Sequence, residues 1–219
     1  GNNISTRALA DMWVHESFAN YAESLYTECL FGTEAGARYV IGNRRGIRND
    51  VPIVPPARGV NAQGSGDMYV KGGNLLHMLR QIVADDVRWR EILRGLQRDF
   101  RHRIVDGADV QRYIAGRAGL DLAPVFTQYL ETTDIPVCEY RIEGQRLHYR
   151  WNGVVAGFAM PIDVTVAPGR QERLVPTTSW QSRPIADPTV FAVDPDWYVT
   201  SRDVDAPPAS PSSSSRTRQ

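Results

Sequence analysis

DMWVHESFANYAESLYTE, residues 11–28, carries the clearest helical pattern in this chain. Its apolar residues recur at helical spacing near one stripe, namely Trp13, Phe18, Tyr21, Ala22, Leu25 and Tyr26. The pattern predicts a helix that starts near Asp11 and stops at Gly32, because glycine is the commonest residue just beyond a helix end. On another face, Glu16 lies one turn from Asn20 and two turns from Glu23, so these three side chains form a polar line.

The pair His15-Glu16 looks like the opening of HExxH, the helical zinc motif. That motif needs a second histidine four residues after the first, and this position holds Ala19. An HExxH motif that starts at His15 is therefore excluded. Glu16 remains a candidate, since a carboxylate on a rigid helix can be the third protein ligand of zinc, and a nearby acidic residue such as Glu23 can orient a ligand histidine. The alternative for these carboxylates is a solvated polar stripe.

Length and composition describe a globular chain. Its 219 residues suffice for one large domain or two small ones with a buried core. Lysine plus arginine and aspartate plus glutamate both number 25, so the formal net charge is zero and nucleic acid is not an expected partner. No apolar run approaches the roughly 18 residues that cross a bilayer. Cys29 and Cys138 do not form a disulfide framework, and the sequence does not indicate a compartment.

The periodicity of the apolar residues changes once, at Pro136. Before it, two further helical faces are expected, Leu75, Leu76, Leu79, Ile82 and Val83 on one, and Val87, Ile92, Leu93 and Leu96 on the next. Asp109 is expected to cap a later helix. After Pro136 the period becomes two, with turns expected at Gly144 and Gly169. This pattern predicts four to six short strands in a β-sandwich.

We therefore expect an α+β fold, with a helical region over residues 1–135, a small β-sandwich over 136–202 and a tail over 203–219. The tail reads DVDAPPASPSSSSRTRQ and has no large apolar residue after Val204. Such a segment cannot bury enough surface to offset the entropy lost on ordering, so we predict that it is disordered.

The N-terminal stretch resembles the gluzincin aminopeptidases of the M1 family, in which a glutamate follows the HExxH motif further along the chain. The matching residues are Gly1, Asn2, Asn3, Ser5, Asp11, Trp13, Glu16, Ser17, Phe18, Ala19, Tyr21 and Glu23. Leu9 departs from the pattern, since many members carry tryptophan there, and His15 stands where asparagine is commonest. The resemblance implies that Glu16 is the third zinc ligand, that Glu23 lies in the shell behind the ligands, and that HExxH lies just upstream of Gly1.

A second match lies in GDMYVKGGNLLHMLRQIV, residues 66–83. It resembles a family segment whose tyrosine donates a hydrogen bond to the oxyanion of the tetrahedral intermediate, and Tyr69 is the matching position. A phenol suits this role because it is a neutral donor that can stabilise charge developing near a metal. The alternative is a tyrosine of the core or of an interface. His77 is expected to pack in the helix bundle, and Lys71 to pair with a carboxylate.

The resemblance implies the C-terminal half of a catalytic domain followed by a β-sandwich, with Zn2+ as the cofactor and peptides as substrates. Both histidines and the general-base glutamate of HExxH are absent, so the chain alone is expected to be inactive. The N-terminal half of the catalytic domain is then a partner, and without it the apolar side of residues 13–26 should be partly uncovered at Trp13, Phe18, Tyr21 and Tyr26. The alternative function is a non-catalytic, M1-like module for binding or assembly.

Overall fold

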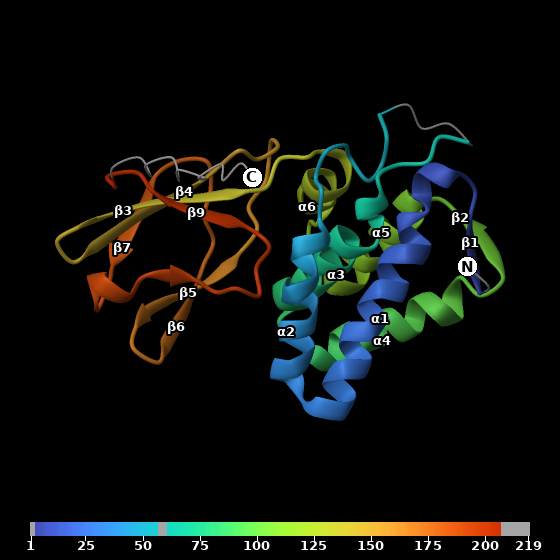
Figure 1. The fold of residues 1–219 in the computed structure, drawn as a ribbon, viewed down its shortest axis with the longest axis horizontal. Helices are drawn as coiled ribbons and strands as arrows, with labels where there is room; N and C mark the ends of the chain where they lie inside the picture. Colours follow the sequence, from blue (N-terminus) through green and yellow to red (C-terminus); the bar gives the residue numbers. More distant parts are fainter. Residues whose placement is uncertain (1–2, 57–60, 207–219) are drawn as a thin grey trace, which may run out of the picture.

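The computed structural model describes residues 3–56 and 61–206, and it confirms the α+β class. Figure 1 shows the helices on one side of the molecule and most strands on the other, joined by the chain that leaves α6. The helices are α1 (Trp13–Phe31), α2 (Thr33–Asn43), α3 (Val70–Val83), α4 (Asp86–Asp99), α5 (Gly107–Ala118) and α6 (Ala123–Phe126), the last continued by a π-helical turn over Thr127–Glu131. Beside them, β1 (Ile4–Thr6) pairs in parallel with β2 (Arg103–Val105).

Helix α1 begins at Trp13, after a 3-10 turn over Leu9–Asp11, and ends at Gly32 as expected, where φ is 90°. The predicted apolar stripe is only partly correct. Trp13 and Tyr21 are buried, but Tyr26 is 67% exposed. The buried face of α1 therefore does not include the C-terminal part of the predicted stripe. Two small hydroxyl residues, Ser17 and Ser24, are buried on α1 instead. They let α1 approach neighbouring elements closely, and each makes a hydrogen bond.

Helix α3 forms the centre of the helical region. Its predicted apolar face is confirmed at Leu75, Leu76, Leu79 and Ile82, and all of the residues from Lys71 to Arg80 are buried. One prediction for the next helix was wrong. Val87 is 64% exposed, because it lies in the first turn of α4 on the side that faces solvent.

Helix α5 is capped by Asp106 and not by Asp109. Asp109 is the third residue of the helix, and its carboxylate accepts a hydrogen bond from the backbone N–H of Asp106 at 3.0 Å. The two aspartates therefore form a reciprocal capping box, and either one could have been taken for the cap from the sequence.

The β-region has seven described strands in two sheets, more than the four to six expected. One sheet has the order β7-β4-β3-β9 and the other β6-β5-β8. The strands are β3 (Val137–Glu143), β4 (Arg146–Asn152), β5 (Ile162–Ala167), β6 (Arg170–Leu174), β7 (Gln181–Pro184), β8 (Ala192–Val193) and β9 (Thr200–Asp203). The expected turns are confirmed at Gly144 and Gly169, where φ is 60° and 69°.

Buried residues at alternate positions of β4 and β5, such as Leu147, Trp151, Ile162 and Val164, form the core of the β-region. The last strand, β9, pairs in parallel with β3 and includes Asp203, the first residue of the expected tail. Residues 207–219, which make up most of that tail, lie outside the described residues.

Hydrogen bonds join the helical region to the β-region. The Arg44 guanidinium donates to the carbonyl oxygens of Pro195 at 2.6 Å and Asp196 at 3.0 Å, and the Tyr129 hydroxyl donates to that of Tyr198 at 2.8 Å. Within residues 3–56 and 61–206, no helix combines the length and apolar character needed to span a bilayer.

Candidate active site

Two helices that are far apart in the sequence meet here at very short range. A Cβ atom on Gly72 of α3 would lie 1.9 Å from the Oγ of Ser17 in α1, and one on Gly73 would lie 2.3 Å from the Oδ1 of Asn20. A larger residue at Gly72 would also meet the Cβ of Ser17 at 2.7 Å, so the helices would have to move apart, whereas one at Gly73 would displace the side chain of Asn20. The glycine pair therefore permits α3 to pack directly against the face of α1 that follows Glu16.

This packing brings the chain neighbours of Glu16 and Tyr69 into contact. The Ser17 hydroxyl donates to the carbonyl oxygen of Met68 at 2.7 Å, and Glu16 precedes Ser17 as Tyr69 follows Met68. Both residues lie at helix starts, Glu16 in the first turn of α1 and Tyr69 immediately before α3. The two residues predicted from separate motifs are thus each one position along the chain from this hydrogen bond.

The Tyr69 side chain is free to meet a ligand. It is 46% exposed, although the helix that follows it is almost wholly buried. Across the described ranges, its hydroxyl has no hydrogen-bond partner. Glu16 is half-buried. One carboxylate and one uncommitted phenol donor thus belong to residues that flank the contact between Ser17 and Met68.

Glu23 lies two turns along α1 and has a partner of its own. Its Oε2 accepts a hydrogen bond from the Tyr39 hydroxyl of α2 at 2.7 Å, and this contact raises the pKa of Tyr39. The Glu23 carboxylate is therefore hydrogen-bonded to the neighbouring helix. Its role in orienting a ligand histidine stays a prediction.

One face of α1 is hollowed. A pocket of about 270 Å³ lies between His15, Phe18 and Ala19 of α1 and Leu96 and Gln97 of α4. The His15 Nε2 atom is buried without a hydrogen-bond partner, and burial lowers the pKa of this imidazole.

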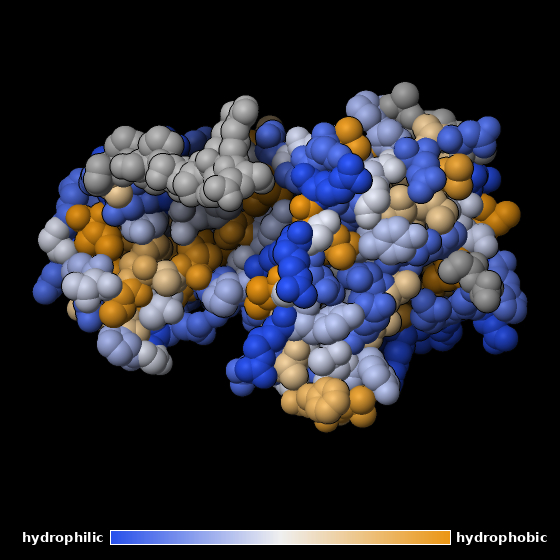
Figure 2. Space-filling model, viewed as in Figure 1, coloured by the Kyte–Doolittle hydropathy of each residue, from blue (hydrophilic) through white to orange (hydrophobic). Residues whose placement is uncertain are grey.

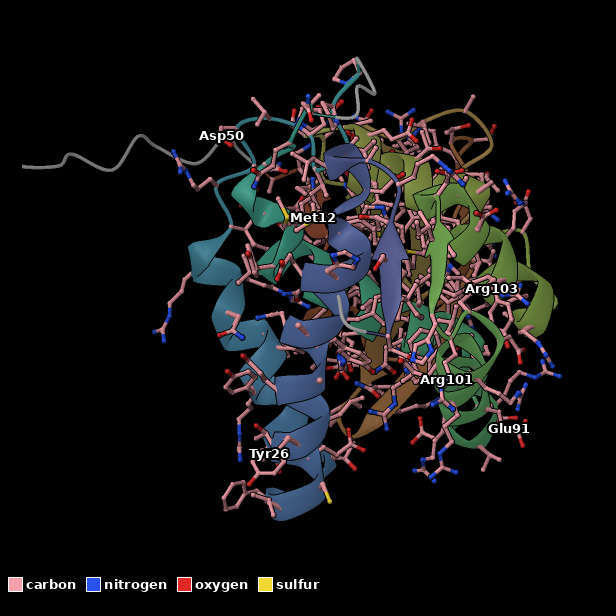
Figure 3. The ribbon with its side chains drawn as sticks, turned by 90° about the vertical axis from the view of Figure 1, so that its right-hand side faces the viewer. Met12, Tyr26, Asp50, Glu91, Arg101 and Arg103 are labelled. Carbon is pink, nitrogen blue, oxygen red and sulfur yellow. The ribbon has the colours of Figure 1, made fainter. Side chains whose placement is uncertain are left out.

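Farther along the same helix, a second pocket of about 440 Å³ is lined by Ala19, Ala22, Glu23 and Tyr26. We call the two pockets together the α1 groove. Figure 3 shows this helix running from Met12 at one end to Tyr26 at the other, along the outside of the helical region.

The exposure of the α1 side chains differs in part from the expectation. Trp13 and Tyr21 were expected to be uncovered, but each is only 1% exposed because both pack into the core of the helical region. Phe18 and Tyr26 do line the open face, together with the alanines between them.

The described residues do not make a complete zinc site. No group of three or more histidine, cysteine, aspartate or glutamate side chains among them could hold a metal ion. A catalytic zinc ion needs three protein ligands and an open position. His77 is 3% exposed, so it is buried as expected, but its Nε2 lies 3.4 Å from the Oδ1 of Asp196, which places it between the helical and β-regions and not within the helix bundle.

Lys71 differs from its prediction. It is wholly buried, and its Nζ donates to the Asn49 Oδ1 at 2.7 Å and to the carbonyl oxygen of Thr132 at 2.9 Å, so its direct partners are neutral oxygens and not a carboxylate. Burial lowers the pKa of Lys71 to about 8. Asn49 and Asp67, which surround this lysine, were missed, because polar residues in a loop carry no periodic signal that marks them as buried.

Comparison with known proteins supports an aminopeptidase fold. No protein-family model matches the chain. The fold is similar to part of the aminopeptidase A of Legionella pneumophila, solved in complex with aspartic acid, with a TM-score of 0.59 and 14% identity over 84% of this chain and 23% of that one. A curated relative is the leucyl aminopeptidase of Saccharolobus solfataricus, 24% identical over 67% of this chain. The chain spans about 20% of the length of that relative.

Proposed function

We propose that this chain is part of a zinc-dependent aminopeptidase of the M1 family, which removes N-terminal residues from peptides. The observation that carries the proposal is the contact between Ser17 and Met68, which joins the two motifs that contain Glu16 and Tyr69. The two motifs were recognised separately in the sequence, and an accidental resemblance in either would not require them to meet in space. The likeness to aminopeptidases in fold and in sequence supports the same function.

In this proposal Glu16 is one of three protein ligands of a zinc ion, and the remaining ligands come from outside this chain. Zinc would polarise the peptide carbonyl group. Tyr69 would donate a hydrogen bond to the oxygen that becomes negatively charged, because a neutral donor placed in advance stabilises that charge without reorganising. Glu23 would lie behind the ligands and orient one of them.

The open α1 groove supports the proposal that the zinc site is incomplete in this chain. It runs along the helix that carries Glu16, and its lining includes Phe18, Ala19, Ala22 and Tyr26, which are apolar or mostly apolar, beside polar residues such as His15 and Glu23. We propose that a helix with the zinc-binding histidines covers this face in the intact protein. The chain alone would then have no peptidase activity.

Metal content and turnover in the intact protein test the proposal. Glu16→Gln keeps the shape of the side chain but removes the charge, so bound zinc and hydrolysis of an aminoacyl-anilide should both fall. Glu91→Gln is the matched control, because Glu91 is an exposed residue of α4, away from α1 (Figure 3). Equal zinc content and turnover in the two variants would favour a non-catalytic module for binding or assembly.

A further inference from the structure

Hydrogen bonds tie the turn that leads to Tyr69 to other segments of the chain. Asp67 lies in this turn, is 1% exposed, and its carboxylate accepts the backbone N–H groups of Arg48 at 3.0 Å and Asn49 at 2.5 Å. The Ser65 hydroxyl accepts the backbone N–H of Asp67 at 3.1 Å. A buried carboxylate that accepts two backbone N–H groups is strongly localised, so the turn is tied to residues 48 and 49.

Lys71 ties the same turn to a second segment. Its ammonium group bridges the side chain of Asn49 and the carbonyl oxygen of Thr132, in the connection that leads from the last helical turn to β3. The Asn49 side-chain amide also donates to the carbonyl oxygen of Thr133. Asn49 itself has a φ of 53°, a left-handed conformation that asparagine tolerates better than most residues. One asparagine thus joins three segments of chain.

We infer that Asn49, Asp67 and Lys71 act together as positioning residues for Tyr69. We call these three residues the Tyr69 clamp. The inference rests on the proposed function for the statement that Tyr69 acts on substrate, but the clamp itself is a feature of this chain. Through it, the place of the Tyr69 hydroxyl depends on the connection into the β-region as well as on the packing of α1 against α3.

Burial of a lysine at this place is hard to explain by stability alone. Taking an ammonium group out of water is costly, and apolar replacements of buried charged groups are often neutral or stabilising. A role as a general base is also excluded, because the Lys71 side chain is wholly buried and its ammonium already donates to two oxygens. Placing a donor within a fraction of an ångström of a reacting atom does require such fixed hydrogen bonds around it.

Hydrogen exchange of this chain tests the clamp without any activity measurement. Lys71→Met keeps the length of the side chain and removes its three donors, and Asn49→Ala removes the shared partner. Both should raise the exchange rates of the backbone amides of residues 48–49 and 67–69 by about 10-fold or more, with unchanged exchange in β3 and β4.

Arg173→Met is the matched control, since Arg173 also bridges the β-region to α3, donating to Asp163 and to the carbonyl oxygen of Gln81 at 3.0 Å. It should leave the exchange of residues 67–69 unchanged. Unaltered exchange in both Lys71→Met and Asn49→Ala would overturn the clamp, whatever the activity of the intact protein.

A double-mutant cycle in the intact enzyme tests whether the clamp acts through Tyr69. Lys71→Met should lower kcat about 10-fold to 100-fold with KM within about twofold, as expected for a displaced catalytic group. In a Tyr69→Phe background the same substitution should have little further effect. Equal losses of kcat in both backgrounds would overturn the inference, since a merely structural role predicts that result. Near-normal kcat in Tyr69→Phe alone would overturn the proposed function instead, and the exchange rates would still decide on the clamp.

Discussion

Tyr69 offers a test at the level of one atom, because its half-exposed ring has an uncommitted hydroxyl. Under the proposed function, Tyr69→Phe in the intact protein should lower kcat about 10²-fold to 10³-fold, the range for loss of one oxyanion donor. The KM and the zinc content should be nearly unchanged, since the ring and Glu16 remain in place. Steady-state kinetics on an aminoacyl-anilide and metal analysis measure these quantities. A variant that keeps more than about a third of wild-type kcat would remove Tyr69 from the site, because that loss is under about 1 kcal/mol.

Glu139 gives a prediction about pH at the same scale. It is 1% exposed, and burial alone would raise its pKa, but hydrogen bonds from Arg202, Arg150 and Asn152 outweigh burial and lower the pKa. Arg150 donates at 2.7 Å and Asn152 at 2.9 Å. A carboxyl whose pKa is lower in the folded state stabilises the fold above its unfolded pKa, and this stability is lost as the pH falls through the folded value.

Glu139→Gln should therefore destabilise the chain by about 1–3 kcal/mol at pH 7, the range for hydrogen bonds to a charged group. The difference from wild type should shrink as the pH is lowered toward 3. Urea unfolding at both pH values measures it, and the exposed Glu91→Gln serves as the control. A difference that is the same at both pH values would contradict the assigned ionisation of Glu139.

At the scale of elements, the contact between α1 and α3 decides whether the site forms. Gly72→Ala places a Cβ atom 1.9 Å from the Ser17 hydroxyl, so we expect a loss of stability of about 1–3 kcal/mol from overpacking. Gly116→Ala in α5 is the matched control, because a Cβ there meets nothing within 4 Å. Alanine in an open helical position should instead stabilise by roughly 0.5–1 kcal/mol. Denaturant unfolding compares the two, and equal effects would mean that the helices do not approach this closely.

At the scale of the whole molecule, an apolar surface lies where α1 meets α2. Figure 2 shows apolar residues gathered at the lower end of the helical region, where Leu30 is 53% exposed and Phe31 is 73% exposed. With the α1 groove beside it, this surface should cause the isolated chain to self-associate. Replacing Tyr26 and Phe31 by serine should lower the association measured by sedimentation velocity. Val87→Ser, on the exposed side of α4, should not, and a monodisperse wild-type chain would favour a finished binding module.

Zinc binding is a second property of the whole chain. Because the described residues offer only one matched ligand, the isolated chain should bind zinc no more tightly than a pair of surface carboxylates. Isothermal titration calorimetry measures this directly. One tight, stoichiometric site would contradict the assignment of Glu16 as a ligand that needs partners from outside this chain.

Local pattern was enough to predict much of this molecule. The change of period at Pro136 separates helices from strands, since helical and extended chains expose their side chains at different intervals. The end of α1 at Gly32 and the turns at Gly144 and Gly169 also followed from residue type, because each has a positive φ that glycine adopts at little cost. Glu16 and Tyr69 were instead predicted from the resemblance of two short motifs to a known family, and their roles stay predictions.

Other features depend on contacts between distant segments and have no local signal. Ser17 and Ser24 of α1 are buried because neighbouring helices approach them, and a helical wheel assigns such residues to the solvent side. Lys71 is wholly buried because Asn49 and Thr132, from loops on either side of it in the sequence, supply its oxygen partners. The motifs name the candidate chemical groups, whereas the contact between Ser17 and Met68 and the hydrogen bonds of Asn49, Asp67 and Lys71 exist only after α1, α3 and the loops have packed. Charge burial and close helix approach are properties of that packing, and no single stretch of the chain encodes them alone.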